Sequence, residues 1–159
     1  MGVAHVRCWW RRQRRGQERR ARWRQHLASL CPGSVGDLTR LSLREHKHTL
    51  TGNIPSEIGE LSRLVVLELD DSSLRGDLPV QLASLTALRI LDLAHTDVAG
   101  TLPTQLAQLT RLTRLHLSET RVSGFLPSQL GSLSMLTHIE LGAQHARHAC
   151  SPYRLQAHT

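Results

Sequence analysis

Aromatic residues are scarce in this chain of 159 residues, where Phe, Tyr and Trp together make up 3%. Aromatic rings fill much of the core of an ordinary globular domain, so leucine must fill the core here. No apolar run reaches the roughly 18 residues of a transmembrane helix. The apolar stretch before Arg11 is also too short for a clear secretory signal. These absences exclude an aromatic-rich core and leave the compartment undecided.

Cysteines are few, and acids are rare at the N-terminus. Cys8, Cys31 and Cys150 are too far apart for a CxxC zinc pattern or a closed disulfide framework. Residues 1–30 contain nine arginines and one acid, Glu18, which gives a charge of +8 against +7 for the whole chain. The remaining residues therefore carry a net charge of −1. Attraction to nucleic acid or anionic membranes can rest only on the N-terminal arm.

One phrase recurs through the middle of the chain. The pattern (L/V)-x-G-x-(L/I)-P ends at Pro55, Pro79, Pro103 and Pro127, and the interval between successive prolines is constant. Between the prolines runs a leucine ladder of the form LxxLxxLxL. Since one unit of this size cannot bury its own leucines, the units must stack on one another.

A single repeat contains signals for a strand, a bend and a helical turn. Leu67 and Leu69 flank Glu68, and this alternation predicts a short strand with leucines inward and the carboxylate in water. Gly76 permits a tight bend, and Pro79 suits the first turn of a helical segment over residues 80–84. We expect the strands to line the inside of a curved solenoid and the helical turns its outside.

The repeats divide the chain into three parts. We expect a poorly ordered basic arm over residues 1–30, four repeats and a partial fifth over 31–141, and a tail over 142–159. The first repeat aligns in two ways: with a loop two residues longer than in later repeats, or with a deletion that places Glu45 at a core position. We favour the longer loop, because an unpaired buried carboxylate costs several kcal/mol while two extra loop residues cost less than about 1 kcal/mol.

The full phrase LxxLxxLxLxx(S/T)x(L/V)xGx(L/I)P resembles the plant-type leucine-rich repeat, as in receptor-like protein ectodomains and protist surface antigens. The family normally has Asn where this chain has Ser72, Thr96 and Thr120. The resemblance implies that these hydroxyls do part of the work of that Asn, which bonds the backbone of the adjacent coil. It also implies an α/β repeat solenoid, a short right-handed coil with a parallel sheet on the concave face and helical or 3-10 turns on the convex face.

Members of this class bind proteins or peptides on the concave face, so the resemblance implies a non-enzymatic interaction module. No capping signature follows the last repeat, which leaves end-to-end self-association open. The chain could also be a fragment of a larger receptor-like protein.

Outward side chains of successive strands should stack in columns about 5 Å apart. The columns combine acids with histidines, which titrate near neutral pH, and they favour recognition of a basic peptide or protein loop. The alternative is a solvated face without a partner. The columns are Glu68, Asp92, His116 and Glu140; Asp70, Ala94, Ser118 and Gly142; and Asp71, His95 and Glu119. The expected partner-binding residues are Glu68, Asp70, Asp71, Asp92, His95, His116, Glu119 and Glu140.

No cofactor or metal is expected. Asp92, His116 and Glu140 lack the tight local spacing of zinc motifs. The sequence also has no phosphate-binding loop and no GxSxG elbow, which argues against an enzyme.

The N-terminal arm supports a competing function, a nucleic-acid or membrane adaptor with the repeats as scaffold. Its arginines could neutralise phosphates or contact an anionic membrane. The arm could equally be an organelle presequence or have no function. The residues concerned are Arg11, Arg12, Arg14, Arg15, Arg19 and Arg20.

Overall fold

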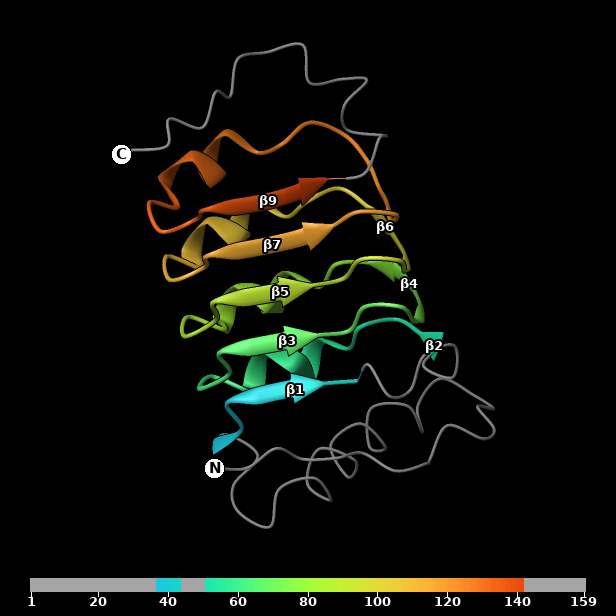
Figure 1. Ribbon diagram of the computed structural model, residues 1–159, viewed down its shortest axis with the longest axis horizontal. Coiled ribbons are helices and arrows are strands. Elements are labelled where there is room, and N and C mark those ends of the chain that lie inside the picture. The colour runs from blue at the N-terminus through green and yellow to red at the C-terminus, as the bar shows by residue number, and fades with distance from the viewer. Residues whose placement is uncertain (1–36, 44–50, 142–159) are drawn as a thin grey trace.

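The structure, a computed structural model, describes residues 37–43 and 51–141 (Figure 1). The three coils that are described in full each contain a strand, a turn, a second short strand and a 3-10 helix. In chain order the elements are β1 (Arg40–Ser42), β2 (Thr51–Gly52), η3 (Ser56–Glu60), β3 (Val66–Glu68), β4 (Ser73–Asp77), η4 (Val80–Ser84), β5 (Ile90–Asp92), β6 (Asp97–Gly100), η5 (Thr104–Gln108), β7 (Arg114–Leu117), β8 (Arg121–Val122), η6 (Ser128–Ser132) and β9 (His138–Leu141).

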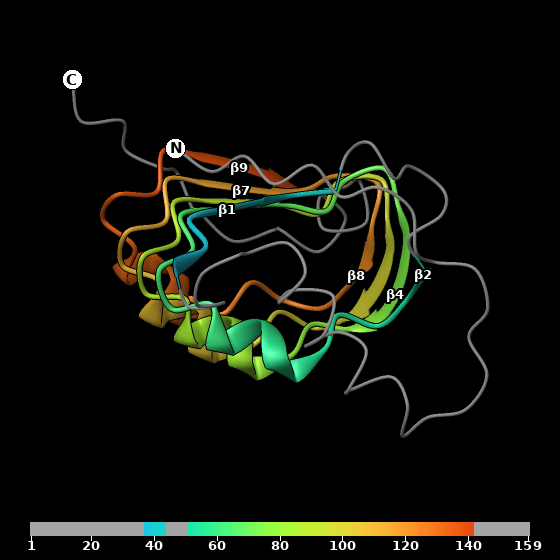
Figure 2. The same ribbon diagram turned by 90° about the horizontal axis from the view of Figure 1, so that it is seen from below.

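The coils form two parallel sheets. One sheet has the order β1-β3-β5-β7-β9 and the other β2-β4-β6-β8, so strand order follows chain order in both. Viewed along the stack, the five-stranded sheet, the four-stranded sheet and the 3-10 helices form three sides of each coil (Figure 2). This arrangement confirms the repeat solenoid that the sequence predicts.

The strand register explains the unequal length of the first coil. Leu67 pairs with Leu91, one proline-to-proline interval further along the chain, whereas the step from Leu41 to its partner Leu67 is longer by two residues. In the second sheet, the number of residues from Gly52 to its partner Leu74 equals the number between paired residues of the later strands of that sheet. The two extra residues therefore lie between β1 and β2, which confirms the longer loop. Glu45 itself lies outside the described residues.

Each repeated proline precedes a 3-10 helix. Pro79 is extended, with a φ of −68°, and its carbonyl accepts a hydrogen bond of 3.0 Å from the Leu82 amide. A bond over three residues defines a 3-10 helix, and such helices are short because their hydrogen-bond geometry is poor. The segment predicted over residues 80–84 is confirmed as η4, and η3, η5 and η6 follow their prolines with the same bond.

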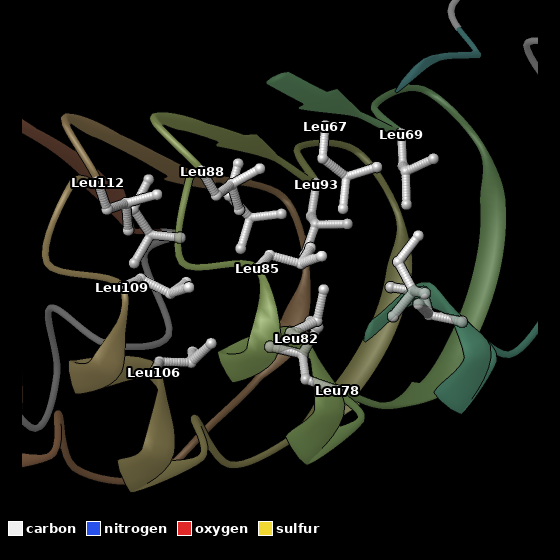
Figure 3. Packing of buried hydrophobic residues seen from close by; sticks show 14 of the residues in the cluster. Leu67, Leu69, Leu78, Leu82, Leu85, Leu88, Leu93, Leu106, Leu109 and Leu112 are labelled. Carbon is white, nitrogen blue, oxygen red and sulfur yellow. The ribbon is translucent and has the colours of Figure 1, made fainter. Parts of the chain in front are cut away.

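The core consists mainly of leucines stacked in columns from coil to coil (Figure 3). Leu61, Leu85 and Leu109 occupy equivalent positions and all have 0% exposure. Burying one such side chain contributes about 1.5–3 kcal/mol. Each leucine packs on its equivalents in the neighbouring coils, so stability arises between adjacent repeats rather than within one.

The column loosens toward the C-terminal coil. Leu133, the equivalent of Leu109, is 5% exposed, and Leu136 and Leu141 are only partly buried against the core. On the surface nearby, Met135 is 48% exposed and Phe125 82%. The last described coil is therefore the least tightly packed.

Candidate protein-binding surface

The five-stranded sheet aligns one predicted column of polar side chains. We call Glu68, Asp92, His116 and Glu140 the acidic column. Glu68 pairs with Asp92, Asp92 with His116, and His116 with Glu140 across consecutive parallel strands. Their leucine neighbours in the strands point into the core, so the four side chains lie on the open face of the sheet. The predicted alignment of these residues is confirmed.

Polar contacts run along this column from coil to coil. The Arg40 guanidinium donates to Glu68 Oε2 at 2.8 Å. His116 Nδ1 lies 3.4 Å from Asp92 Oδ2, and its Nε2 lies 4.0 Å from Glu140 Oε1. The imidazole of His116 therefore sits between two carboxylates from the neighbouring strands.

The members of the acidic column differ in how deeply they are buried. Glu68 and Asp92 are each 6% exposed, and Asp70, in the next predicted column, is 8% exposed. The expectation that these carboxylates lie in water was wrong. Strands about 5 Å apart crowd their side chains together, and Asp92 also accepts a hydrogen bond of 3.1 Å from the Ala94 amide through Oδ1. A buried carboxylate with such partners mainly organises its surroundings.

The accessible part of the predicted site lies toward the C-terminal coils. The His116 side chain is 24% exposed and that of Glu140 62%. His95 and Glu119 are also exposed, whereas Asp71 is half-buried. Of the eight predicted residues, the three exposed ones can reach a partner most readily, together with the partly exposed imidazole.

Asp71, His95 and Glu119 share an unusual backbone conformation where the strands end. Their φ angles are 55°, 55° and 54°, in the left-handed region that residues other than glycine seldom adopt. The His95 amide donates to the Ser118 carbonyl of the next coil at 2.9 Å, and the Asp71 amide makes the equivalent bond. The turn therefore presents the third predicted column at the rim of the sheet.

The residue after each of these three carries a hydroxyl that forms a hydrogen bond within its own coil. Thr96 Oγ1 donates to the Leu93 carbonyl at 2.8 Å, and Ser72 and Thr120 make the same bond three residues back. The expectation of a bond to the adjacent coil was wrong for these hydroxyls. A hydroxyl is shorter than the Asn side chain of the family, which explains why it stays within its own turn.

A second column on the same face was missed. Val66 pairs with Ile90 and Ile90 with Arg114, while Arg40 and His138 occupy the two ends. Arg40, Arg114 and His138 are exposed, and Val66 and Ile90 are half-buried. The period of two in a strand was the available signal, because each residue stands two positions before a member of the acidic column or its equivalent in β1.

Residues 37–43 and 51–141 contain no group of three or more His, Cys, Asp or Glu able to hold a metal ion. No helix in the same ranges is long and apolar enough to cross a membrane. Gly142, which was predicted to belong to a column, lies outside the described ranges, as do the arm residues Arg11, Arg12, Arg14, Arg15, Arg19 and Arg20.

Comparison with known proteins connects this geometry to a family. A profile described as Leucine Rich Repeat matches residues 111–133. A search of curated proteins found no match.

Three solved plant structures have folds similar to that of this chain. The receptor kinase ectodomain of GASSHO1/SCHENGEN3 from Arabidopsis thaliana, in complex with CASPARIAN STRIP INTEGRITY FACTOR 2, is 33% identical with a TM-score of 0.62, covering 67% of this chain and 13% of that chain. The plant peptide hormone receptor RGFR1, in complex with RGF2, is 28% identical with a TM-score of 0.64, covering 68% and 17%. A plant ice-binding protein is 35% identical with a TM-score of 0.57, covering 60% and 31%.

The chain thus matches less than a fifth of the length of the two receptors. The shared features are the parallel sheet of repeating strands, the 3-10 turns and the repeated leucine phrase. The chain belongs to the leucine-rich-repeat proteins, and its solenoid is of the kind found in plant receptor ectodomains.

Proposed function

We propose that this protein is a non-enzymatic interaction module that binds a protein or peptide on the open face of its five-stranded sheet. One observation carries the proposal: two columns of side chains lie in register across that face, over strands joined by continuous parallel pairing. Such a face offers an extended partner a regular row of polar and apolar contacts.

The solved relatives support a peptide or protein ligand, since two of them were determined as complexes with such partners. The ice-binding relative shows that the fold alone does not decide the ligand. The side chains must therefore decide it. In this chain the reachable ones carry both signs of charge, at Arg114 on one side and at Glu119 and Glu140 on the other.

A pair of identical substitutions on opposite faces tests the proposal. Ser118 lies half-buried on the open face beyond β7, and Ser128 is exposed in η6 on the opposite side. Ser118→Arg places bulk and charge in the proposed surface, and Ser128→Arg is its control. Both should change the free energy of unfolding by less than about 0.5 kcal/mol.

Affinity capture from cells that express the protein, followed by titration of each purified partner, provides the measurement. We expect Ser118→Arg to weaken the binding of the partner by about tenfold or more, and Ser128→Arg to leave the affinity unchanged. A partner that binds both variants like the unmodified chain would place the site elsewhere.

A further inference from the structure

Arginines gather along the edge where the strands of the five-stranded sheet begin. This edge is the side of Figure 1 from which the arrows β1, β3, β5, β7 and β9 start. Five of the seven arginines among the described residues lie at a strand start or in the turn before it, and the other two, Arg75 and Arg121, belong to the second sheet. We call the five the basic edge: Arg40, Arg63, Arg89, Arg111 and Arg114.

Two members of the basic edge are already paired. Arg40 contacts Glu68, and Arg63 contacts Asp37. Arg89, Arg111 and Arg114 are exposed, and none of them forms an ion pair with another residue in the described ranges. Within the described part of the chain, three guanidinium groups without an ion-pair partner therefore lie at the starts of β5 and β7.

These three arginines lie at or just before the starts of the adjacent strands β5 and β7, beside an apolar strip. The Arg114 amide donates to the Arg89 carbonyl at 3.0 Å, and Arg111 stands three residues earlier in the turn before β7. Ile90 pairs with Arg114, and Val66 pairs with Ile90, both half-buried on the open face. Arginine suits carboxylate groups because its planar fork can donate two parallel hydrogen bonds.

The neighbouring carboxylates limit the width of a ligand. Along each strand, the acidic column lies two residues, or about 7 Å, beyond the column that contains Val66, Ile90 and Arg114. A broad polyanion would face those carboxylates, whereas a narrow extended chain can follow the edge. Phe125, the one Phe, Tyr or Trp among the described residues, follows β8 in the second sheet, so it offers no stacking for a nucleic-acid base at this edge.

We propose that Arg89, Arg111 and Arg114 bind carboxylates of an acidic segment in a protein partner, with apolar side chains of that segment resting on Val66 and Ile90. The inference rests on the proposed function, because it names the class of partner for the same sheet. The partner then has the opposite charge to the one expected from the sequence, because the carboxylates that favoured a basic partner are largely buried or bonded to neighbouring residues.

The test measures binding of a labelled peptide of Asp, Glu and Leu to the full chain by fluorescence anisotropy. Arg89→Ser with Arg114→Ser removes two charges from the edge. Arg75→Ser with Arg121→Ser is the matched control, since it removes two exposed charges from the second sheet and leaves the N-terminal arm unchanged. We expect the edge variant to bind about tenfold more weakly and the control to lose less than about twofold.

The outcomes are distinct. Arg89→Gln with Arg114→Gln, which retains bulk at both positions, must reproduce the loss if the charges are responsible. Equal loss in edge and control variants, or equal binding of a peptide with Lys in place of its acids, would overturn the proposal. Tighter binding of a single-stranded oligonucleotide of equal charge, lost in the same edge variant, would replace the acidic partner by a nucleic acid. If Ser118→Arg abolishes partner binding and the edge variant does not, the proposed function stands and this inference falls.

Discussion

Replacing Thr96 by Val tests the turn that follows β5, one of three equivalent turns after β3, β5 and β7. Thr96 is 5% exposed, and its hydroxyl donates to the Leu93 carbonyl at 2.8 Å. Valine has nearly the same shape, so the change removes a buried hydrogen bond while keeping the side-chain volume. One net hydrogen bond contributes about 0.5–1.5 kcal/mol, and a buried acceptor that loses its donor costs about 1–3 kcal/mol. We expect Thr96→Val to lower the free energy of unfolding by about 1–3 kcal/mol.

Thr113 provides a matched control just before β7. Its hydroxyl donates to the Arg89 carbonyl at 2.9 Å, but the bond is exposed. Water can replace the lost donor there, and valine is favourable beside a strand. Thr113→Val should therefore cost less than about 0.5 kcal/mol. The difference between the two variants isolates the effect of burial.

Urea denaturation followed by circular dichroism gives both values, provided that the slope against urea stays constant between variants. Ser72→Ala and Thr120→Val repeat the test in two other coils, where the same hydroxyl bond measures 2.7 Å and 2.8 Å. Equal losses for Thr96→Val and Thr113→Val would refute the argument that the buried bond holds the turn.

Three further substitutions probe the packing, the bend and the buried carboxylate. Leu91→Ala, at a position with 0% exposure, should cost about 2–5 kcal/mol in urea denaturation. Met135→Ala, at a position 48% exposed, should cost far less, and similar losses would contradict the core assignment. Gly100→Ala should cost about 1–2 kcal/mol on the same assay, because Gly100 has a φ of +78° and an added methyl would meet the side chain of the preceding coil; a neutral result would show that the bend tolerates a side chain. Asp92→Ala should cost about 1–3 kcal/mol because the Ala94 amide loses its acceptor, and hydrogen exchange at that amide should quicken; unchanged exchange would count against it.

The architecture could be predicted because it depends on spacing. Evenly spaced prolines and the leucines between them set which side chains stack, whatever their detailed conformations. The predicted helical segment at residues 80–84 and the alignment of Glu68 with Asp92 both follow from that spacing. The longer first loop was predictable too, because burying Glu45 without a partner would cost more than lengthening a loop.

The exposure of the candidate site could not be predicted in the same way. Whether Asp92 reaches water depends on the side chain opposite it, His116, and on the amide two residues on, which the spacing of repeats does not reveal. The left-handed turn at His95 was equally hidden, since glycine or asparagine would have been its usual signal. The arginine-rich edge was hidden for a different reason: Arg63, Arg89 and Arg111 lie before the strands begin, where the alternation of inward and outward side chains gives no signal.

The constant register from β3 to β9 has a consequence for how such a chain can change in length. Deleting residues 85–108 in frame would bring Leu109 against Leu61 and His116 beside Glu68, so that a leucine takes the place of a leucine and an imidazole that of a carboxylate. Unequal recombination can therefore remove or add whole repeats without creating a mismatched contact in the core. The length of the proposed binding face can therefore be inherited in steps of one complete repeat.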